Sequence, residues 1–310
     1  MIRVTSLAVS MGRTSESVAY HYEIAKTRIV FQTAVKSLKA YEIGPASASF
    51  NDLLNTNKNR DFLNASNSEL RYQGLMPFRS HVVEIRYWQH NEISQIDVNT
   101  VPICQIDFAN AHIHVLNDQS FYDDLNLEVV IGPALIMLLS KQGLYCLHAG
   151  AVATPQGNFA MLAESGTGKS TLSTHIDADW LQLADDILPL KLGDGAELIH
   201  QFPQLKLNDA RVSKRLDQTV FLDCILRLDQ EPSAQIEFKC LKRTDALLQV
   251  VRHTVAAKLF DQAMMREHAR FAKHLTKRVP VYALSYPRDL NKLDELRGDI
   301  SDFISNLKQS

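Results

Sequence analysis

The sequence of 310 residues contains few cysteines, and they lie far apart, at Cys104, Cys146, Cys224 and Cys240. No two of them form a CxxC pair, so the sequence predicts neither a zinc site nor a disulfide framework. We therefore expect isolated, buried thiols.

The sequence also lacks a long hydrophobic run. The longest, VVIGPALIMLL (129–139), is too short to span a bilayer and is interrupted by Gly132 and Pro133. The N-terminal stretch MIRVTSLAVSMGR is too short and too polar for a signal peptide. These observations predict a cytoplasmic protein that does not enter a membrane.

A strong net charge is absent as well, since 33 basic and 35 acidic residues give a formal net charge of −2. Such a chain has no overall field that attracts nucleic acid or an anionic membrane, so an anion site must be local. The basic stretch REHARFAKHLTKR (266–278) is best interpreted as a solvated helix face. Basic and aromatic residues do not alternate as in a nucleic-acid platform, and we expect no nucleic-acid partner.

Apolar side chains, by contrast, make up 45% of the sequence, enough for a sizeable core in one large domain or two modest ones. Residues 1–125 alternate short apolar stretches with polar turns, as in HVVEIRYW (81–88), which predicts strands. We expect a smaller N-terminal α/β domain of unknown role here. His112 and His114 share a strand face, but no third metal ligand accompanies them, so ordinary packing is the simpler interpretation.

Residues 126–310 form the second expected domain. Its predicted helices are residues 128–143, 244–260, 261–276 and a last helix through 303. Its predicted strands are residues 144–148, 151–154, 158–162, a pair within 180–192, and 279–286. Thr244 or Asp245 is the expected N-cap of the helix that follows it.

The stretch AESGTGKS (163–170) follows one of these strands and precedes a helical pattern. It matches the P-loop pattern GxxxxGK[ST] except at its first position. Gly166 and Gly168 allow successive backbone N–H groups to face an anion, and the helix adds its positive end. Lys169 is then expected to reach the β- and γ-phosphates, and the Ser170 hydroxyl to ligate Mg²⁺.

Nucleotide binding is therefore the main functional prediction. The expected nucleotide-binding residues are Glu164, Ser165, Gly166, Thr167, Gly168, Lys169, Ser170 and Thr171. Ala163 replaces the usual first glycine, which costs little at an ordinary negative φ and about 1 kcal/mol or more at a left-handed one. The sequence leaves both cases open.

Asp185 and Asp186 end an apolar strand about one helix after Lys169. In a parallel sheet they would emerge beside the loop. One carboxylate could hold the metal while the other accepts the proton of a hydroxyl, provided that the strand ends or bulges there. His148 ends the strand before the loop strand, and spacing alone is equally consistent with packing and with a place in the site.

The segments LHAGAVA, AESGTGKSTLS and LADDILPL resemble, in this order and at similar separations, the HPr kinase/phosphorylase group and its HPr-kinase-like relatives. The resemblance covers about residues 144–192, continues more weakly to the C-terminus and does not include residues 1–125. It implies a mixed α/β P-loop core of the phosphoenolpyruvate-carboxykinase-like fold. It also implies a homo-oligomer that uses ATP and Mg²⁺ to phosphorylate a serine hydroxyl.

By position, the resemblance aligns His148 with the family's site histidine, Lys169 with its phosphate lysine and Ser170 with its metal-binding residue. It aligns Asp185 with the proton acceptor and Asp186 with the neighbouring acid, which we expect to help hold the metal. These alignments give the expected catalytic set.

The segment IHQFPQLKLNDARV (199–212) departs from the bifunctional members of the group, because it lacks their glycine-rich sequence with a glutamate. We therefore expect a kinase without efficient phosphorylase activity. Its hydroxyl acceptor is expected to be a peptide, a protein or a small molecule, with HPr less favoured because the N-terminal region differs.

Two other classes of function remain open. The chain could be a non-catalytic ATP-binding sensor, against which Lys169, Ser170 and the paired acids argue, because a sensor needs no base. It could also be a P-loop ATPase, although such enzymes normally have a single acid at the strand end and no upstream histidine.

Overall fold

The computed structural model describes residues 18–24, 27–33, 68–78, 81–115, 132–164, 180–193, 195–198 and 220–309, together with Thr167, Lys169 and Leu172. The chain has a mixed α/β fold and divides into two compact units. The first comprises Met1–Gln142 and Ala256–Asp261, and the second comprises Gly143–Val255 and Gln262–Ser310. The domain boundary expected at residue 125 lies outside the described residues.

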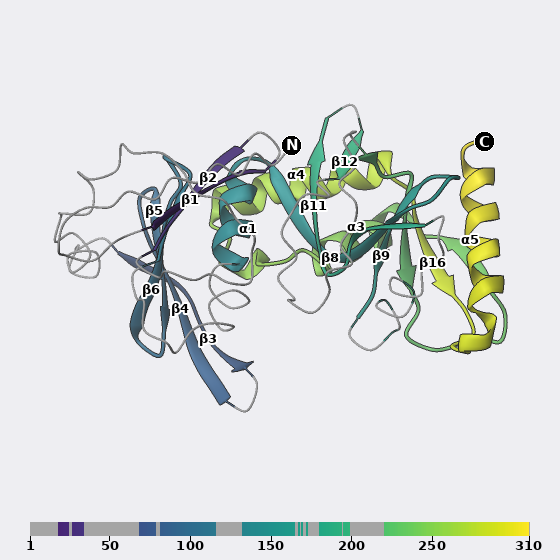
Figure 1. Cartoon of the computed structure of the whole chain (residues 1–310), viewed down its shortest axis with the longest axis horizontal. Helices are drawn as coiled ribbons and strands as arrows, with labels where there is room; N and C mark the ends of the chain where they lie inside the picture. The colour runs from purple at the N-terminus through teal and green to yellow at the C-terminus, as the bar shows by residue number, and fades with distance from the viewer. Residues whose placement is uncertain are drawn as a thin grey trace. The chain divides into compact units, whose positions relative to one another are not determined.

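The first unit is built on a seven-stranded sheet (Figure 1) with the order β1-β2-β7-β6-β5-β4-β3. Its strands are β1 (Val18–Ile24), β2 (Thr27–Thr33), β3 (Glu69–Phe78), β4 (His81–His90), β5 (Ile93–Val98), β6 (Val101–Asp107) and β7 (His112–Val115). All neighbours pair antiparallel except β2 and β7. The helix α1 (Gly132–Lys141) and the 3-10 helix η3 (Ala257–Leu259) complete the described part of this unit.

Side chains alternate between buried and accessible along β4, as expected for a strand with one face in a core. Val83, Ile85 and Tyr87 are buried, whereas their neighbours are partly or largely exposed. The rings of His112 and His114 lie edge to face at 5.8 Å. Burial lowers the pKa of His114. No group of three or more metal-binding side chains occurs among the described residues.

The second unit holds a nine-stranded sheet. Its strands are β8 (Leu144–Ala153), β9 (Asn158–Leu162), β10 (Leu181–Ala184), β11 (Ile187–Leu192), β12 (Ala196–Leu198), β13 (Val220–Phe221), β14 (Cys224–Leu228), β15 (Glu237–Cys240) and β16 (Val281–Ser285). Its helices are α3 (Arg243–Arg252), α4 (Gln262–Arg278), the 3-10 helix η4 (Leu290–Lys292) and α5 (Leu293–Leu307).

The order of this sheet is β13-β12-β11-β8-β9-β14-β16-β15, and β10 also pairs with β8. The strands β9, β14 and β16 are parallel, whereas β8 runs antiparallel to β9, β10 and β11. The helix α5 runs beside the strands (Figure 1), and Ile300 and Ile304, one helical turn apart, join Phe159 and Met161 in a buried core. Tyr145 of β8 instead contacts Phe271 of α4. Because β9, β14 and β16 run parallel, their carboxyl ends lie along the same edge of the sheet. The candidate site lies at this edge.

Several elements differ from the sequence-based expectation. The strands expected at 144–148 and 151–154 are one continuous strand, β8. The helix expected at 244–260 stops at Arg252, because Thr254 pairs with Leu147 of β8 as an isolated bridge and returns the chain to the sheet. Its N-cap is Lys242, without a side-chain hydrogen bond, so Thr244 and Asp245 lie inside the first turn. The cysteines are unpaired as expected, but Cys240 is exposed.

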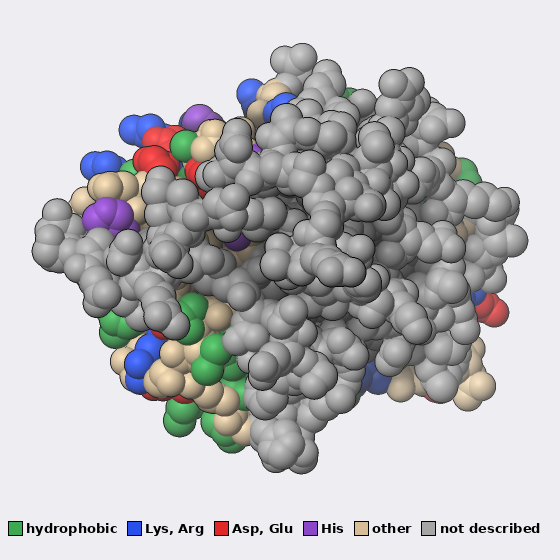
Figure 2. Space-filling view, turned by 60° about the vertical axis from the view of Figure 1, so that its left-hand side comes forward, with side chains coloured by type: hydrophobic (Ala, Val, Ile, Leu, Met, Phe, Trp, Pro, Cys, Tyr) green, Lys and Arg blue, Asp and Glu red, His purple; other side chains and the backbone are tan. Residues whose placement is uncertain are grey.

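The described surface includes apolar side chains (Figure 2). Leu75 of β3 and Val82 of β4 are each more than half exposed. None of the described helices has the length and apolar composition needed to cross a bilayer.

Candidate phosphate-transfer site

The segment AESGTGKS (163–170), which matches the phosphate-loop pattern, follows β9 directly in the sequence. Ala163 is almost completely buried and packs in the same core as Met161 and Leu172. It is not among the described residues with positive φ, so its side chain introduces no left-handed strain. Alanine is therefore accommodated at the first position of the motif, and its methyl group adds to the core.

The next described residues form a turn that is anchored to β16. The backbone N–H and the Oγ1 hydroxyl of Thr167 both donate to the carbonyl oxygen of Glu164, at 3.3 and 2.6 Å. Tyr286, which follows β16, donates its hydroxyl to the carbonyl oxygen of Thr167 at 3.0 Å. Burial raises the pKa of Tyr286, so this phenol remains a donor. The carbonyl oxygens of Glu164 and Thr167 are thereby both hydrogen-bonded.

Three of the predicted catalytic residues meet in one cluster. The ammonium of Lys169, a buried side chain, lies 3.3 Å from Asp186 Oδ1 and 3.2 Å from His148 Nε2. His148 Nδ1 lies 3.2 Å from the same carboxylate oxygen. These contacts match the tautomer in which Nδ1–H donates to Asp186 and Nε2 accepts from Lys169. We call Lys169, His148 and Asp186 the site cluster.

The strand arrangement explains how the site cluster forms. Ile187 of β11 lies opposite His148, and Ala149 N–H donates to the carbonyl oxygen of Asp186 at 3.0 Å. The acids were expected at the end of a strand in a parallel sheet. Instead, β10 and β11 pair antiparallel with β8, which lies between β11 and β9. The acids occupy the bend between β10 and β11, after a register shift between Gln182 and Ala184.

The two neighbouring acids have different surroundings. Asp186 belongs to the site cluster, whereas Asp185 Oδ1 accepts a hydrogen bond from Gln182 Nε2 at 3.4 Å. Both are partly exposed. The bend between β10 and β11 is the strand interruption that both side chains would need in order to reach one site. The role of Asp185 as proton acceptor stays a prediction.

Other expected ligands of the nucleotide fall outside the described residues. These are Ser165, Gly166, Gly168, Ser170 and Thr171. Mg²⁺ that arrives with a nucleotide needs only one or two carboxylates from the protein, because phosphates and water supply its remaining oxygens. Asp186, a partly exposed carboxylate at the strand interruption, fits that limited requirement.

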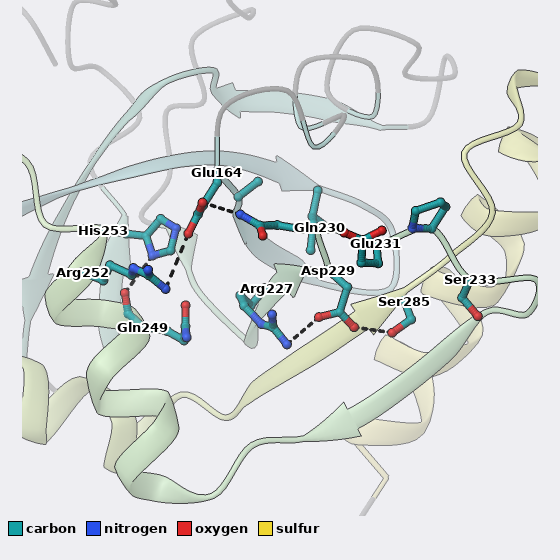
Figure 3. A pocket seen from close by; sticks show the side chains of 13 residues that line it. Glu164, Arg227, Asp229, Gln230, Glu231, Ser233, Gln249, Arg252, His253 and Ser285 are labelled. Carbon is teal, nitrogen blue, oxygen red and sulfur yellow. Dashed lines mark hydrogen bonds and ion pairs between the residues drawn. The ribbon is translucent and has the colours of Figure 1, made fainter.

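Two cavities adjoin the start of the phosphate loop. The first, of about 510 Å³, extends over the end of β14, the residues that follow it and Ser285, the last residue of β16 (Figure 3). The second, of about 400 Å³, includes His148 of the site cluster. Both volumes lie in the range of small-molecule sites. The residues that line both cavities are Ala163, Glu164, Arg252 and His253.

Arg252 and His253 were not identified from the sequence. They stand at the end of α3, and the sequence pattern predicted that this helix continues to residue 260. His253 Nδ1 donates to the carbonyl oxygen of Gln249 at 2.9 Å, which leaves Nε2 as an acceptor. Burial lowers the pKa of His253, which favours the neutral form of its ring. An arginine and a histidine within a helical pattern are a weak signal, because the structure alone shows that the helix ends at these residues.

No protein-family model matches this chain, and no curated protein matches it.

Proposed function

We propose that this chain is an ATP- and Mg²⁺-dependent kinase that transfers the γ-phosphoryl group to a hydroxyl of a peptide, a protein or a small molecule, without efficient phosphorylase activity. We also propose that its second unit has the phosphoenolpyruvate-carboxykinase-like P-loop core of the HPr-kinase-like proteins that its sequence resembles. The observation that carries this proposal is the site cluster, because it joins the loop lysine, the upstream histidine and one of the paired acids within hydrogen-bond distance.

Each residue then has a role in positioning or in proton transfer. Lys169 binds the β- and γ-phosphates, and Asp186 with Ser170 holds Mg²⁺, which supplies positive charge to the phosphates when bound. Asp185 accepts the proton of the acceptor hydroxyl. His148 orients the acceptor or the γ-phosphate, and its 3.2 Å contact with Asp186 Oδ1 restrains the ring.

The test compares variants of Lys169 and Asp185 in transfer from labelled ATP. The acceptors are free serine, serine-containing peptides with internal and C-terminal serine, and an HPr-like domain. Lys169→Met should reduce transfer about 10³-fold, because electrostatic stabilisation carries most of this chemistry. Lys273→Met, which changes an exposed lysine of α4, should leave it unchanged.

Asp185→Asn should abolish transfer while leaving the ATP dissociation constant largely unchanged, because a base acts on the acceptor. Transfer by Asp185→Asn at the parental rate would show that the base is another group. Tight ATP binding without turnover would support the sensor, and hydrolysis that no acceptor accelerates would support the ATPase.

A further inference from the structure

Residues 253–255, which we call the bridge segment, follow α3 and pair with β8. His148 N–H donates to the carbonyl oxygen of His253 at 2.7 Å. The next residue, Thr254, lies opposite Leu147 as an isolated antiparallel bridge. The bridge segment also lines the second cavity, together with His148. Its position therefore restrains the backbone of one member of the site cluster and shapes a wall of the cavity.

The side chain of Thr254 anchors the bridge segment to two helices. Its hydroxyl donates to the carbonyl oxygen of Val250 in α3 at 2.8 Å, and Nε2 of His268 in α4 lies 2.8 Å from the same hydroxyl oxygen. Because the single hydroxyl proton goes to Val250, Thr254 Oγ1 accepts a hydrogen bond from His268 Nε2–H. The ring of His268 is almost completely buried, and burial lowers its pKa, which favours the neutral form.

The pair formed by Thr254 and His268 lies among apolar groups. The ring centroid of Tyr145 lies 5.4 Å from that of His268 and 4.7 Å from that of Phe271, and Leu147 opposite Thr254 is fully buried. Replacing both partners of a buried hydrogen bond by apolar groups of the same shape is nearly neutral for stability. Such a replacement loses direction, because a hydrogen bond orients its groups and apolar contact does not. The pair is therefore better explained by the position that it gives the bridge segment.

Thr276 of α4 is a matched comparison for Thr254. Its hydroxyl donates to the carbonyl oxygen of Ala272, four residues earlier, at 3.0 Å, just as Thr254 donates to Val250. Both threonines are partly buried. Within the described residues, the Thr276 hydroxyl contacts carbonyl oxygens of its own helix only, whereas the Thr254 hydroxyl also contacts His268. The contact with a second helix is thus what distinguishes Thr254.

We propose that Thr254 and His268 are positioning residues of the candidate site, which act on His148 through the bridge segment. The effect on catalysis rests on the proposed function, whereas the placement of His148 can be measured without it. The hydrogen bond between Thr254 and His268 holds the carbonyl oxygen of His253 against the His148 N–H, and the His148 ring then faces Lys169. Without this hydrogen bond the bridge segment shifts, and His148 no longer orients the acceptor or the γ-phosphate.

The first test measures hydrogen exchange of single backbone amides by NMR on the full chain, without nucleotide or acceptor. Thr254→Val replaces the hydroxyl by a methyl group of similar size, and the His148 amide should then exchange about 10-fold faster. The Ile225 amide, which donates to the carbonyl oxygen of Pro280 at 3.0 Å in the same unit, should keep its rate. A merely structural role would accelerate both amides, because global unfolding exposes both.

Three variants sharpen this test. Thr254→Ser keeps the hydroxyl and should restore slow exchange of the His148 amide. Thr276→Val removes the matched hydroxyl and should leave that amide unchanged. The double variant Thr254→Val with His268→Leu removes both partners of the hydrogen bond, so it should unfold near the urea concentration of the unsubstituted chain. Its His148 amide should still exchange fast, because apolar contact does not restore the orientation.

The second test is transfer from labelled ATP to the acceptors named above. Thr254→Val and the double variant should lower kcat about 10-fold, because displaced groups lose orientation. The dissociation constant of ATP should change by less than about 2-fold, since His148 orients groups and does not carry uniform binding. Thr254→Ser and Thr276→Val should transfer at the parental rate.

Three outcomes contradict the inference: an unchanged His148 amide in Thr254→Val, acceleration that Ile225 shares, or parental transfer by the double variant. Absence of transfer in the unsubstituted chain, with a His148 amide that responds as expected, would instead contradict the proposed function. The two failures are therefore distinguishable.

Discussion

Buried polar residues of β5 in the first unit bind one another, whereas the buried Lys169 of the second unit contacts side chains beside a cavity. In β5, Ser94 accepts a hydrogen bond from Tyr87 Oη at 2.8 Å, and Gln95 Nε2 donates to Asp97 Oδ1 at 2.8 Å. Trp88 Nε1 donates to the other oxygen of Asp97, also at 2.8 Å. Burial raises the pKa of Asp97, and the two hydrogen bonds oppose this rise. This network is enclosed within the sheet.

In the second unit, the buried Lys169 contacts His148 and Asp186, which are both partly exposed, and His148 lines a cavity. Buried polar and charged side chains therefore have different roles in the two units. Where the hydrogen-bonding groups pair within a sheet, they stabilise it. Where they gather at interrupted or ending strands beside a cavity, they border a space of the size that small-molecule ligands occupy.

The largest effect on stability should come from breaking the network of the first unit. Gln95 is fully buried, donates to Asp97 and accepts from Gln105 Nε2 at 2.9 Å. Gln95→Ala leaves both partners unsatisfied and creates a cavity, so the free energy of unfolding should fall by about 3 kcal/mol. Nucleotide affinity should be unchanged.

Urea unfolding followed by tryptophan fluorescence measures this effect. The chain has two tryptophans, so in a Trp180→Phe background Trp88 reports on the first unit alone. The matched control is Gln73→Ala on β3, where an exposed side chain donates to Glu84, and the change should stay within about 0.5 kcal/mol. Loss of nucleotide affinity in Gln95→Ala with an unchanged Trp88 transition would contradict the comparison.

Part of the candidate site could be predicted from the sequence because its signals are local. The phosphate-loop motif identified Lys169, and the interrupted apolar run identified the paired acids. The structure brings Lys169 and Asp186 within 3.3 Å. The strand β9 was also found, since apolar residues bounded by turn residues are a short-range pattern.

The rest depends on contacts between distant segments, which a periodic pattern does not contain. Arg252 reaches Glu164 because α3 stops early, and it stops where Val255 N–H donates to the carbonyl oxygen of Cys146 at 2.9 Å. The helical pattern beyond residue 252 is overridden by this pairing with β8. The same limitation explains why the antiparallel direction of β10 and β11 was not foreseen.

Substitution of Ala163 tests whether this position at the start of the loop contributes to the stability of the second unit or to nucleotide binding. Its methyl group is buried in the core of the second unit, and its φ is not positive. Ala163→Gly restores the usual first letter of the motif but removes that methyl group and adds backbone entropy to the unfolded chain. The free energy of unfolding should fall by about 1.5 kcal/mol, measured by urea unfolding with Trp180 fluorescence in a Trp88→Phe background. ATP affinity should be unchanged, and a clear gain in affinity would show that alanine impairs the loop.

The smallest expected effect concerns backbone strain in the first unit, far in sequence from any candidate site residue. Asn99 and Thr100 connect β5 to β6 with φ values of 48° and 70°. Two positive φ values in a two-residue connection are typical of a type I′ turn, which favours Asn-Gly, and a β-branched residue is strained there. Thr100→Gly should relieve about 1–2 kcal/mol of strain and lose about 0.5–1 kcal/mol through unfolded-state entropy. The net gain of about 0.5 kcal/mol should appear in the Trp88 urea transition. Thr100→Ala keeps a Cβ and should gain less, and an equal gain in both variants would mean that branching alone, and not the left-handed backbone, strains this turn.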